Sequence, residues 1–148
     1  MPALMKFLHV LAAVAWLGGI SFMLLALRPT VAQLLAPPQR LPLMVQTMQR
    51  FFGLVWVSIA LLLLSGMAML LGVGMKQAPV GWHVMLGLGL VMFALFGHLY
   101  FGPFRRLKHA VGAADWPEGG RRAGQIATLA GVNLGLGALA IAAVIFII

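Results

Sequence analysis

The sequence alternates between long apolar stretches and shorter segments that hold most of its charged residues. Four long stretches without a charged side chain run over residues 7–27, 51–75, 77–104 and 123–148. A helix that crosses a bilayer needs about 20 consecutive, mainly apolar residues. Because proline suits the first turn of a helix better than its interior, Pro79 shortens the third stretch to residues 80–103. The pattern predicts four transmembrane helices, over residues 7–27, 51–75, 80–103 and 123–148.

The composition agrees with a chain embedded in lipid. Of its 148 residues, 63% are hydrophobic and 8% are charged, and the mean hydropathy is +1.06. A soluble domain carries about 25% charged residues. We therefore expect an all-α, integral membrane four-helix bundle that forms a single transmembrane domain over residues 1–148. The first apolar stretch is longer than the core of a signal peptide, about 7–15 residues, so we expect it to be retained as a helix.

The basic residues are distributed unevenly. There are ten lysines and arginines against two acidic residues. Eight of the ten lie in the first and third connections between the predicted helices: Arg28, Arg40, Arg50, Arg105, Arg106, Lys108, Arg121 and Arg122. The positive-inside rule then predicts that both termini lie outside, an N-out/C-out arrangement. We expect a multi-pass protein of a bacterial-type inner (plasma) membrane, whose basic residues contact anionic lipid rather than nucleic acid.

The connections and the small residues complete the expected organisation. The first connection is rich in proline and predicts a loop with a short interfacial stretch at Leu34 and Leu35, and the third predicts a solvated loop. Gly131 and Gly135 in the fourth helix have the spacing that lets two helices approach closely. This spacing favours packing within the chain and leaves a homo-oligomer open. Asn133, between them, is expected to bond across to a neighbouring helix.

Histidines are the candidate chemical groups. Cysteine is absent, which excludes disulfides and thiolate metal sites. Ionisable side chains within apolar helices are costly and are therefore functional candidates. His9 lies 19 residues before Arg28, and His83 lies 22 residues before Arg105, which is roughly 28 Å and 33 Å at the helical rise. The two imidazoles are thus predicted to lie within about 5 Å of one depth.

Two imidazoles at one depth on separate helices can ligate a haem iron from both sides. We expect haem b with His9 and His83 as axial ligands, with Trp16 and Trp82 as cofactor-binding residues beside the macrocycle. Trp82 fits equally well as an anchor at the membrane surface. His98, near the inner end of the third helix, is a further candidate cofactor-binding residue.

Copper is the alternative metal for the same two histidines. Thioether sulfur is a soft donor that suits Cu(I), and the methionines nearest to His9 and His83 are Met5 and Met85. Structural alternatives stay open as well, because single histidines often bond between helices and methionines often fill apolar cores.

The residues also resemble known families. The run from His9 to Gly19 resembles the first helix of CopD-like membrane proteins, and the stretch Leu64-Ser65-Gly66 resembles their second helix. The HemJ-type protoporphyrinogen oxidases are similar over nearly the whole length, at His9, Trp16, Trp82, His83, His98 and Asn133. The resemblance implies a four-helix membrane protein that binds b-type haem. It implies copper uptake or tolerance in the CopD branch and protoporphyrinogen oxidation in the HemJ branch.

Two positions depart from the HemJ pattern. Met85 stands where HemJ-type proteins have a lysine two residues after the third-helix histidine. Leu24 and Leu25 stand where they have a Pro-Arg pair. Both departures count against protoporphyrinogen oxidation.

The function predicted from sequence is that of a haem-b-binding membrane protein that transfers electrons, with a quinone or another redox partner. A bis-histidine haem has no open coordination position, which favours outer-sphere electron transfer. The alternatives are a CopD-type protein of copper transport or tolerance, a HemJ-type protoporphyrinogen oxidase, and a structural subunit without a cofactor. An enzymatic role would be that of a membrane oxidoreductase.

Overall fold

The protein is helical throughout the part of the chain that its computed structural model describes, residues 2–147. The elements in chain order are α1 (Pro2–Phe22), η1 (Met23–Leu27), α2 (Arg28–Leu34), α3 (Pro37–Val73), α4 (Val80–Leu99), η2 (Tyr100–Phe104), α5 (Arg105–Gly112) and α6 (Trp116–Phe146). They join into four rods long and apolar enough to cross a membrane, at Ala3–Leu34, Pro37–Val73, Val80–Gly112 and Trp116–Phe146. The predicted all-α, four-helix membrane fold is therefore confirmed.

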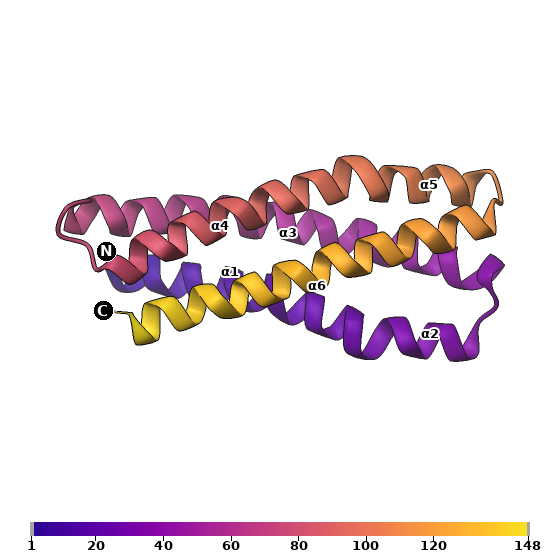
Figure 1. The fold of residues 1–148 in the computed structure, drawn as a ribbon, viewed down its shortest axis with the longest axis horizontal. Coiled ribbons are helices and arrows are strands. Elements are labelled where there is room, and N and C mark those ends of the chain that lie inside the picture. Colours follow the sequence, from indigo (N-terminus) through magenta and orange to yellow (C-terminus); the bar gives the residue numbers. More distant parts are fainter. Residues whose placement is uncertain (1, 148) are drawn as a thin grey trace.

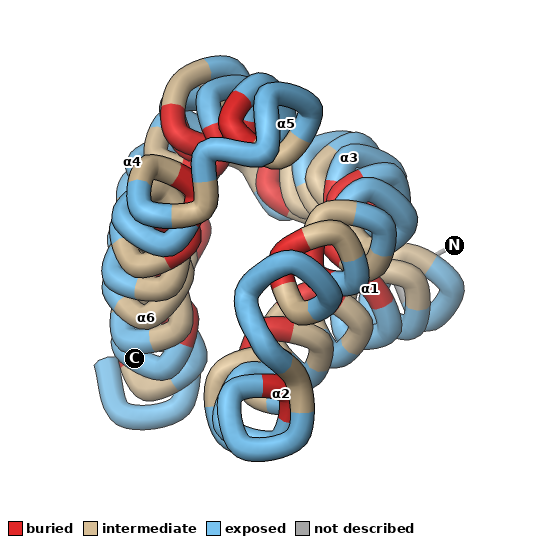
Figure 2. The backbone as a smooth tube through the Cα atoms, turned by 90° about the vertical axis from the view of Figure 1, so that its right-hand side faces the viewer, coloured by how far each residue is buried: buried red, intermediate tan, exposed pale blue. Residues whose placement is uncertain are grey.

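The four rods lie side by side along one axis (Figure 1). Both ends of the chain and the turn between α3 and α4 lie at one end of the bundle, which we call the terminal end. The breaks between α2 and α3 and between α5 and α6 lie at the opposite, basic end. α1 packs mainly on α3, and α4 packs mainly on α6. Figure 2 shows these two pairs next to each other, with buried positions on the sides that the helices turn toward one another.

The first and third connections are much shorter than predicted, and the loops expected there are wrong. α2 continues to Leu34 and α3 begins at Pro37, which leaves only Leu35 and Ala36 between them. The third connection consists of residues 113–115. The loop was predicted from the prolines, but Pro37 and Pro38 start α3. In the first turn of a helix a backbone N–H has no partner within the helix, so proline, which lacks this N–H, costs little there. The rods consequently extend beyond the predicted spans.

Two π-helical segments accommodate Pro29 and Pro103 without a break in the rod. Pro29 follows η1 directly after Arg28, and Pro103 lies inside η2. In an α-helix the proline ring collides with the carbonyl four residues earlier, and a π-helical turn widens the backbone at that point. At the end of η1 the Arg28 N–H bonds to the carbonyl oxygen of Met23, five residues earlier. Both rods therefore continue past proline toward the basic end.

The interior toward the basic end is aromatic. The ring centroid of Phe52 lies 4.8 Å from that of Phe104 and 5.3 Å from that of Phe96. Trp16, which is 2% exposed, stacks on Phe93 at 5.9 Å. These residues come from α1, α3, α4 and η2, so the aromatic cluster joins the two helix pairs. The outward faces carry exposed leucine, valine and phenylalanine side chains, as expected of a surface that meets lipid.

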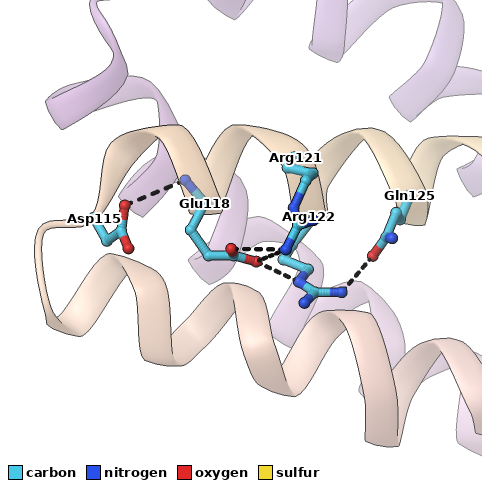
Figure 3. A network of polar contacts seen from close by, with 5 residues as sticks. All are labelled: Asp115, Glu118, Arg121, Arg122 and Gln125. Atoms are coloured by element: carbon cyan, nitrogen blue, oxygen red, sulfur yellow. Dashed lines mark hydrogen bonds and ion pairs between the residues drawn. The ribbon is translucent and has the colours of Figure 1, made fainter.

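Both acidic residues of the chain help to begin α6 at the basic end (Figure 3). The Glu118 N–H donates to Asp115 Oδ1 over 3.3 Å, which caps the helix. The Glu118 carboxylate accepts from Arg121 over 2.9 Å and also pairs with Arg122. Arg122 in turn donates to Gln125 Oε1 over 2.9 Å. Negative charge at a helix N-terminus is favourable, so this network fixes the start of the last rod.

Candidate metal-binding site

His9 is half-buried on α1 and bonds to α3. Its Nδ1 atom lies 2.9 Å from Ser65 Oγ, and Ser65 is 2% exposed. The neighbouring Gly66 makes room for the ring, because a Cβ atom there would lie 3.3 Å from His9 Cε1. Ser65 thus binds the imidazole, and Gly66 lets the ring pack against the backbone of α3.

The bonding of Ser65 determines which nitrogen of His9 is protonated. Ser65 Oγ donates its hydrogen to the carbonyl oxygen of Leu61, within its own helix. A serine hydroxyl has one hydrogen and two lone pairs, so toward His9 it can only accept. His9 Nδ1 therefore carries the proton and donates to Ser65, while Nε2 keeps its lone pair. An imidazole held through one nitrogen, with the other free, is the usual arrangement of a metal ligand.

Met5 is the predicted soft donor closest to His9 along the chain. It lies four residues earlier on α1 and is half-buried. Side chains four residues apart on a helix are neighbours on one face. An imidazole and a thioether are thus available on the same face of α1, in its terminal half.

His83 does not join His9 in a buried pair. It lies in the first turns of α4, in the other helix pair, and is exposed. Trp82 beside it and Met85 two residues later are half-buried. The two imidazoles therefore do not form a buried pair of opposed ligands in this structure. Haem ligation by His9 and His83 stays a prediction from sequence.

The remaining candidates lie apart from one another. His98 is exposed near the end of α4, next to Gly102, where a Cβ atom would lie 3.7 Å from His98 Cε1. His109 is exposed on α5, and Trp16 belongs to the aromatic interior. Within residues 2–147, no group of three or more histidine and acidic side chains gathers in a way that could hold a metal ion.

A cavity between the helices was not predicted from the sequence. It has a volume of about 30 Å³ and is lined mainly by apolar side chains from α1, η1, α3, α4 and α6, with Asn133 from α6. Asn133 Nδ2 donates to the carbonyl oxygen of Met92 over 3.2 Å, which confirms the predicted bond to a neighbouring helix. Met44 and Met48 also line the cavity. Their spacing of four residues places them on one face of α3. This spacing can be read from the sequence and could have indicated a pair of neighbouring thioethers.

The fold defines a multi-pass helical membrane protein in which a histidine of the first helix bonds to a serine of a neighbouring helix. The model of the family described as copper resistance protein D, CopD, matches residues 45–147. The chain belongs to the CopD family, since this match covers more than half of its length. No curated protein matches the chain, and neither does any solved structure.

The family match confirms one of the two predicted resemblances. It spans most of α3 and all of α4, α5 and α6, so Ser65, Gly66 and His83 lie within it. His9 and the run to Gly19 precede the matched residues. The HemJ-type assignment stays a prediction.

Proposed function

We propose that this protein binds copper within the bilayer and carries it across the membrane, with His9 Nε2 as a ligand. The observation that carries the proposal is the bond from His9 to Ser65, which orients an imidazole and leaves one nitrogen free. Membership of the copper resistance protein D family supports copper as the metal. A polar group in the apolar layer is costly unless it has a function or a partner, and the bond from His9 to Ser65 engages Nδ1 and not Nε2.

The donor atoms of the chain favour Cu(I) over harder cations. Zinc sites use thiolates, imidazoles and carboxylates, and magnesium and calcium use oxygen ligands. The chain has no cysteine, and its two acidic residues, Asp115 and Glu118, lie at the start of α6 at the basic end. It has ten methionines, and thioether sulfur selects soft ions such as Cu(I). An imidazole beside the Met5 thioether is a donor pair of this kind.

Haem-b electron transfer is the second candidate function, because the free Nε2 of His9 would suit haem iron as well as copper. The two candidates differ in what the purified protein contains. Bis-histidine haem gives a sharp α-band when reduced, whereas Cu(I) is colourless.

The test is an anaerobic Cu(I) titration of the protein, purified from cells supplied with haem, against the chromogenic Cu(I) chelator bicinchoninate. We expect at least one Cu(I) per chain and no haem absorption. Liposomes that contain the protein should also accumulate Cu(I) faster than empty liposomes. A low-spin haem spectrum that His83→Ala abolishes, without competitive copper binding, would replace the copper proposal with the haem candidate. A protein that holds neither copper nor haem would contradict both.

We also propose that the basic end of the bundle faces the cytoplasm of a bacterial-type cell. Eight of the ten basic residues lie within residues 28–50 and 105–122, on the helices around the two chain breaks of the basic end, and the termini lie at the opposite end. Short segments rich in lysine and arginine are retained on the cytoplasmic side. A fluorescent reporter that folds only in the cytoplasm should therefore be bright when inserted at Ala113 and dark when fused to the C-terminus. A bright C-terminal fusion would reverse the orientation.

A further inference from the structure

The cavity between the helices is lined by several sulfur atoms. Three methionines line it: Met23 from η1, and Met44 and Met48 from α3. Met44 is 3% exposed and Met48 is 2% exposed, so both thioethers are withdrawn from lipid and water. A volume of about 30 Å³ is enough for one water molecule or one ion, since one water needs about 10–15 Å³ by this kind of measure.

Asn133 adds an unpaired oxygen to the same cavity. The side chain is 2% exposed and lines the cavity. Its Nδ2 is bonded to Met92, but its Oδ1 is buried without a hydrogen-bond partner. An unsatisfied buried polar atom costs about 1–3 kcal/mol. The oxygen is therefore placed to accept a hydrogen bond or to face a positive charge inside the cavity.

The wall of the cavity includes a π-helical turn. Met23, Leu24 and Leu27 of η1 all line it. Single π-helical turns inside α-helices are frequent at functional sites. Pro29 explains why the turn forms at this height, and the turn brings the Met23 side chain to the cavity.

We propose that this cavity is an internal Cu(I) site, with the thioethers of Met23, Met44 and Met48 as ligands and Asn133 Oδ1 oriented by the bond to Met92 to stabilise the ion or its water. The inference rests on the proposed copper function. It adds a second site, because Trp16, the first residue of α1 that lines the cavity, follows His9 by seven residues, about 10 Å along α1. Copper bound at His9 would thus have a next position deeper in the bundle, toward the basic end.

Arg28 limits how tightly such a site can hold a cation. It is the charged residue among the described residues that line the cavity, and it lies at the start of α2 with its side chain exposed. A positive charge at the rim opposes a resident cation. Conduction requires binding that is favourable enough for entry and weak enough for release, and the positive charge of Arg28 would favour release.

The test compares two double variants of the full-length protein. Met44→Leu with Met48→Leu removes two sulfur atoms from the cavity at nearly constant volume. Met67→Leu with Met69→Leu is the matched control, since these methionines lie on the same helix and do not line the cavity. We expect two Cu(I) per wild-type chain in the bicinchoninate titration. The cavity variant should lose one of the two Cu(I) equivalents, or bind it at least tenfold more weakly. Its Cu–S scattering in X-ray absorption should fall as well. The control variant should keep two Cu(I) equivalents and the Cu–S scattering of the wild type.

The single variant Met23→Leu provides a second measurement that does not alter α3. It should weaken the same equivalent, with the helical circular dichroism of the wild type. If the wild type binds Cu(I) through His9 and the cavity variants bind it unchanged, the methionines of the cavity serve only in packing. The inference is then overturned while the proposed function stands. If neither the wild type nor any variant binds Cu(I), the proposed function fails. Loss of copper from the cavity variant but not from His9→Ala would keep the inference and overturn the role of His9.

Discussion

Replacing His9 with alanine is expected to abolish copper uptake by liposomes that contain the protein. The substitution removes the free Nε2 lone pair and leaves Ser65 to bond only within α3. Ser65→Ala should have a smaller effect, because it removes the group that orients the imidazole and keeps the imidazole itself. Loss of such an orienting partner typically costs about 10–100-fold in metal affinity or activity. Initial rates of Cu(I) uptake, measured with an encapsulated Cu(I)-sensitive dye, provide the comparison.

His109→Ala is the matched control, since it removes an exposed imidazole from α5 and should leave uptake unchanged. His9→Met places a thioether, a soft donor, at the same position. It should therefore retain part of the Cu(I) uptake that His9→Ala loses. Wild-type rates in His9→Ala would show that the imidazole is not a ligand, and the bond to Ser65 would then serve only to join α1 and α3.

Gly81→Ala is expected to lower the stability of the bundle by about 1–3 kcal/mol, the usual cost of overpacking. Gly81 is buried in the first turn of α4, where a Cβ atom would collide with the carbonyl oxygens of Ala143 and Ile147 at the end of α6. Backbone atoms cannot turn aside as a flexible side chain can, so α4 and α6 would have to separate at the terminal end. Thermal unfolding of the purified protein in detergent would measure the loss.

Gly87→Ala on the same helix is the control for this prediction. No atom lies within 4 Å of a Cβ added at Gly87, and alanine is favoured over glycine in a helix by about 0.8–1.0 kcal/mol. Gly87→Ala should therefore unfold at the same temperature as the wild type or at a higher one. Equal stability of Gly81→Ala and the wild type would mean that α4 and α6 do not approach so closely.

The number of membrane-spanning rods could be predicted from sequence because the lipid bilayer constrains how the backbone can fold. A long apolar stretch has to be a helix in lipid, since each backbone polar group needs an internal partner there. The ends of the rods could not be predicted in the same way. The sequence pattern predicts a loop around Pro29, Pro37 and Pro38, but Pro37 and Pro38 start α3 and Pro29 follows a π-helical turn. Whether proline ends a helix depends on its position within the turn, which the pattern does not contain.

The candidate site was predicted in part. The cost of an ionisable group in lipid singled out His9, and the structure places it on an interior contact. Its partner Ser65 is 56 residues away in the sequence, and pairing them requires the rotation of both helices about their axes. The prediction that His9 and His83 lie at one depth used only the helical rise. The helical rise does not say toward which side each helix turns these side chains. The exposure of His83 and the gathering of Met23 with Met48 both depend on that rotation.

The length of the rods has a consequence for how such a protein can change in evolution. α3 has 37 residues, about 55 Å at the helical rise, whereas the hydrocarbon layer is about 30 Å thick. A helix of this length can cross the hydrocarbon layer and leave the chain breaks at residues 35–36 and 113–115 outside it. Within that span the described backbone forms helical hydrogen bonds, so an ion meets side-chain ligands rather than the unwound backbone carbonyls of many transporters. In the proposed copper function, metal preference would be set by a few side chains, and single substitutions could alter it while the scaffold stays the same.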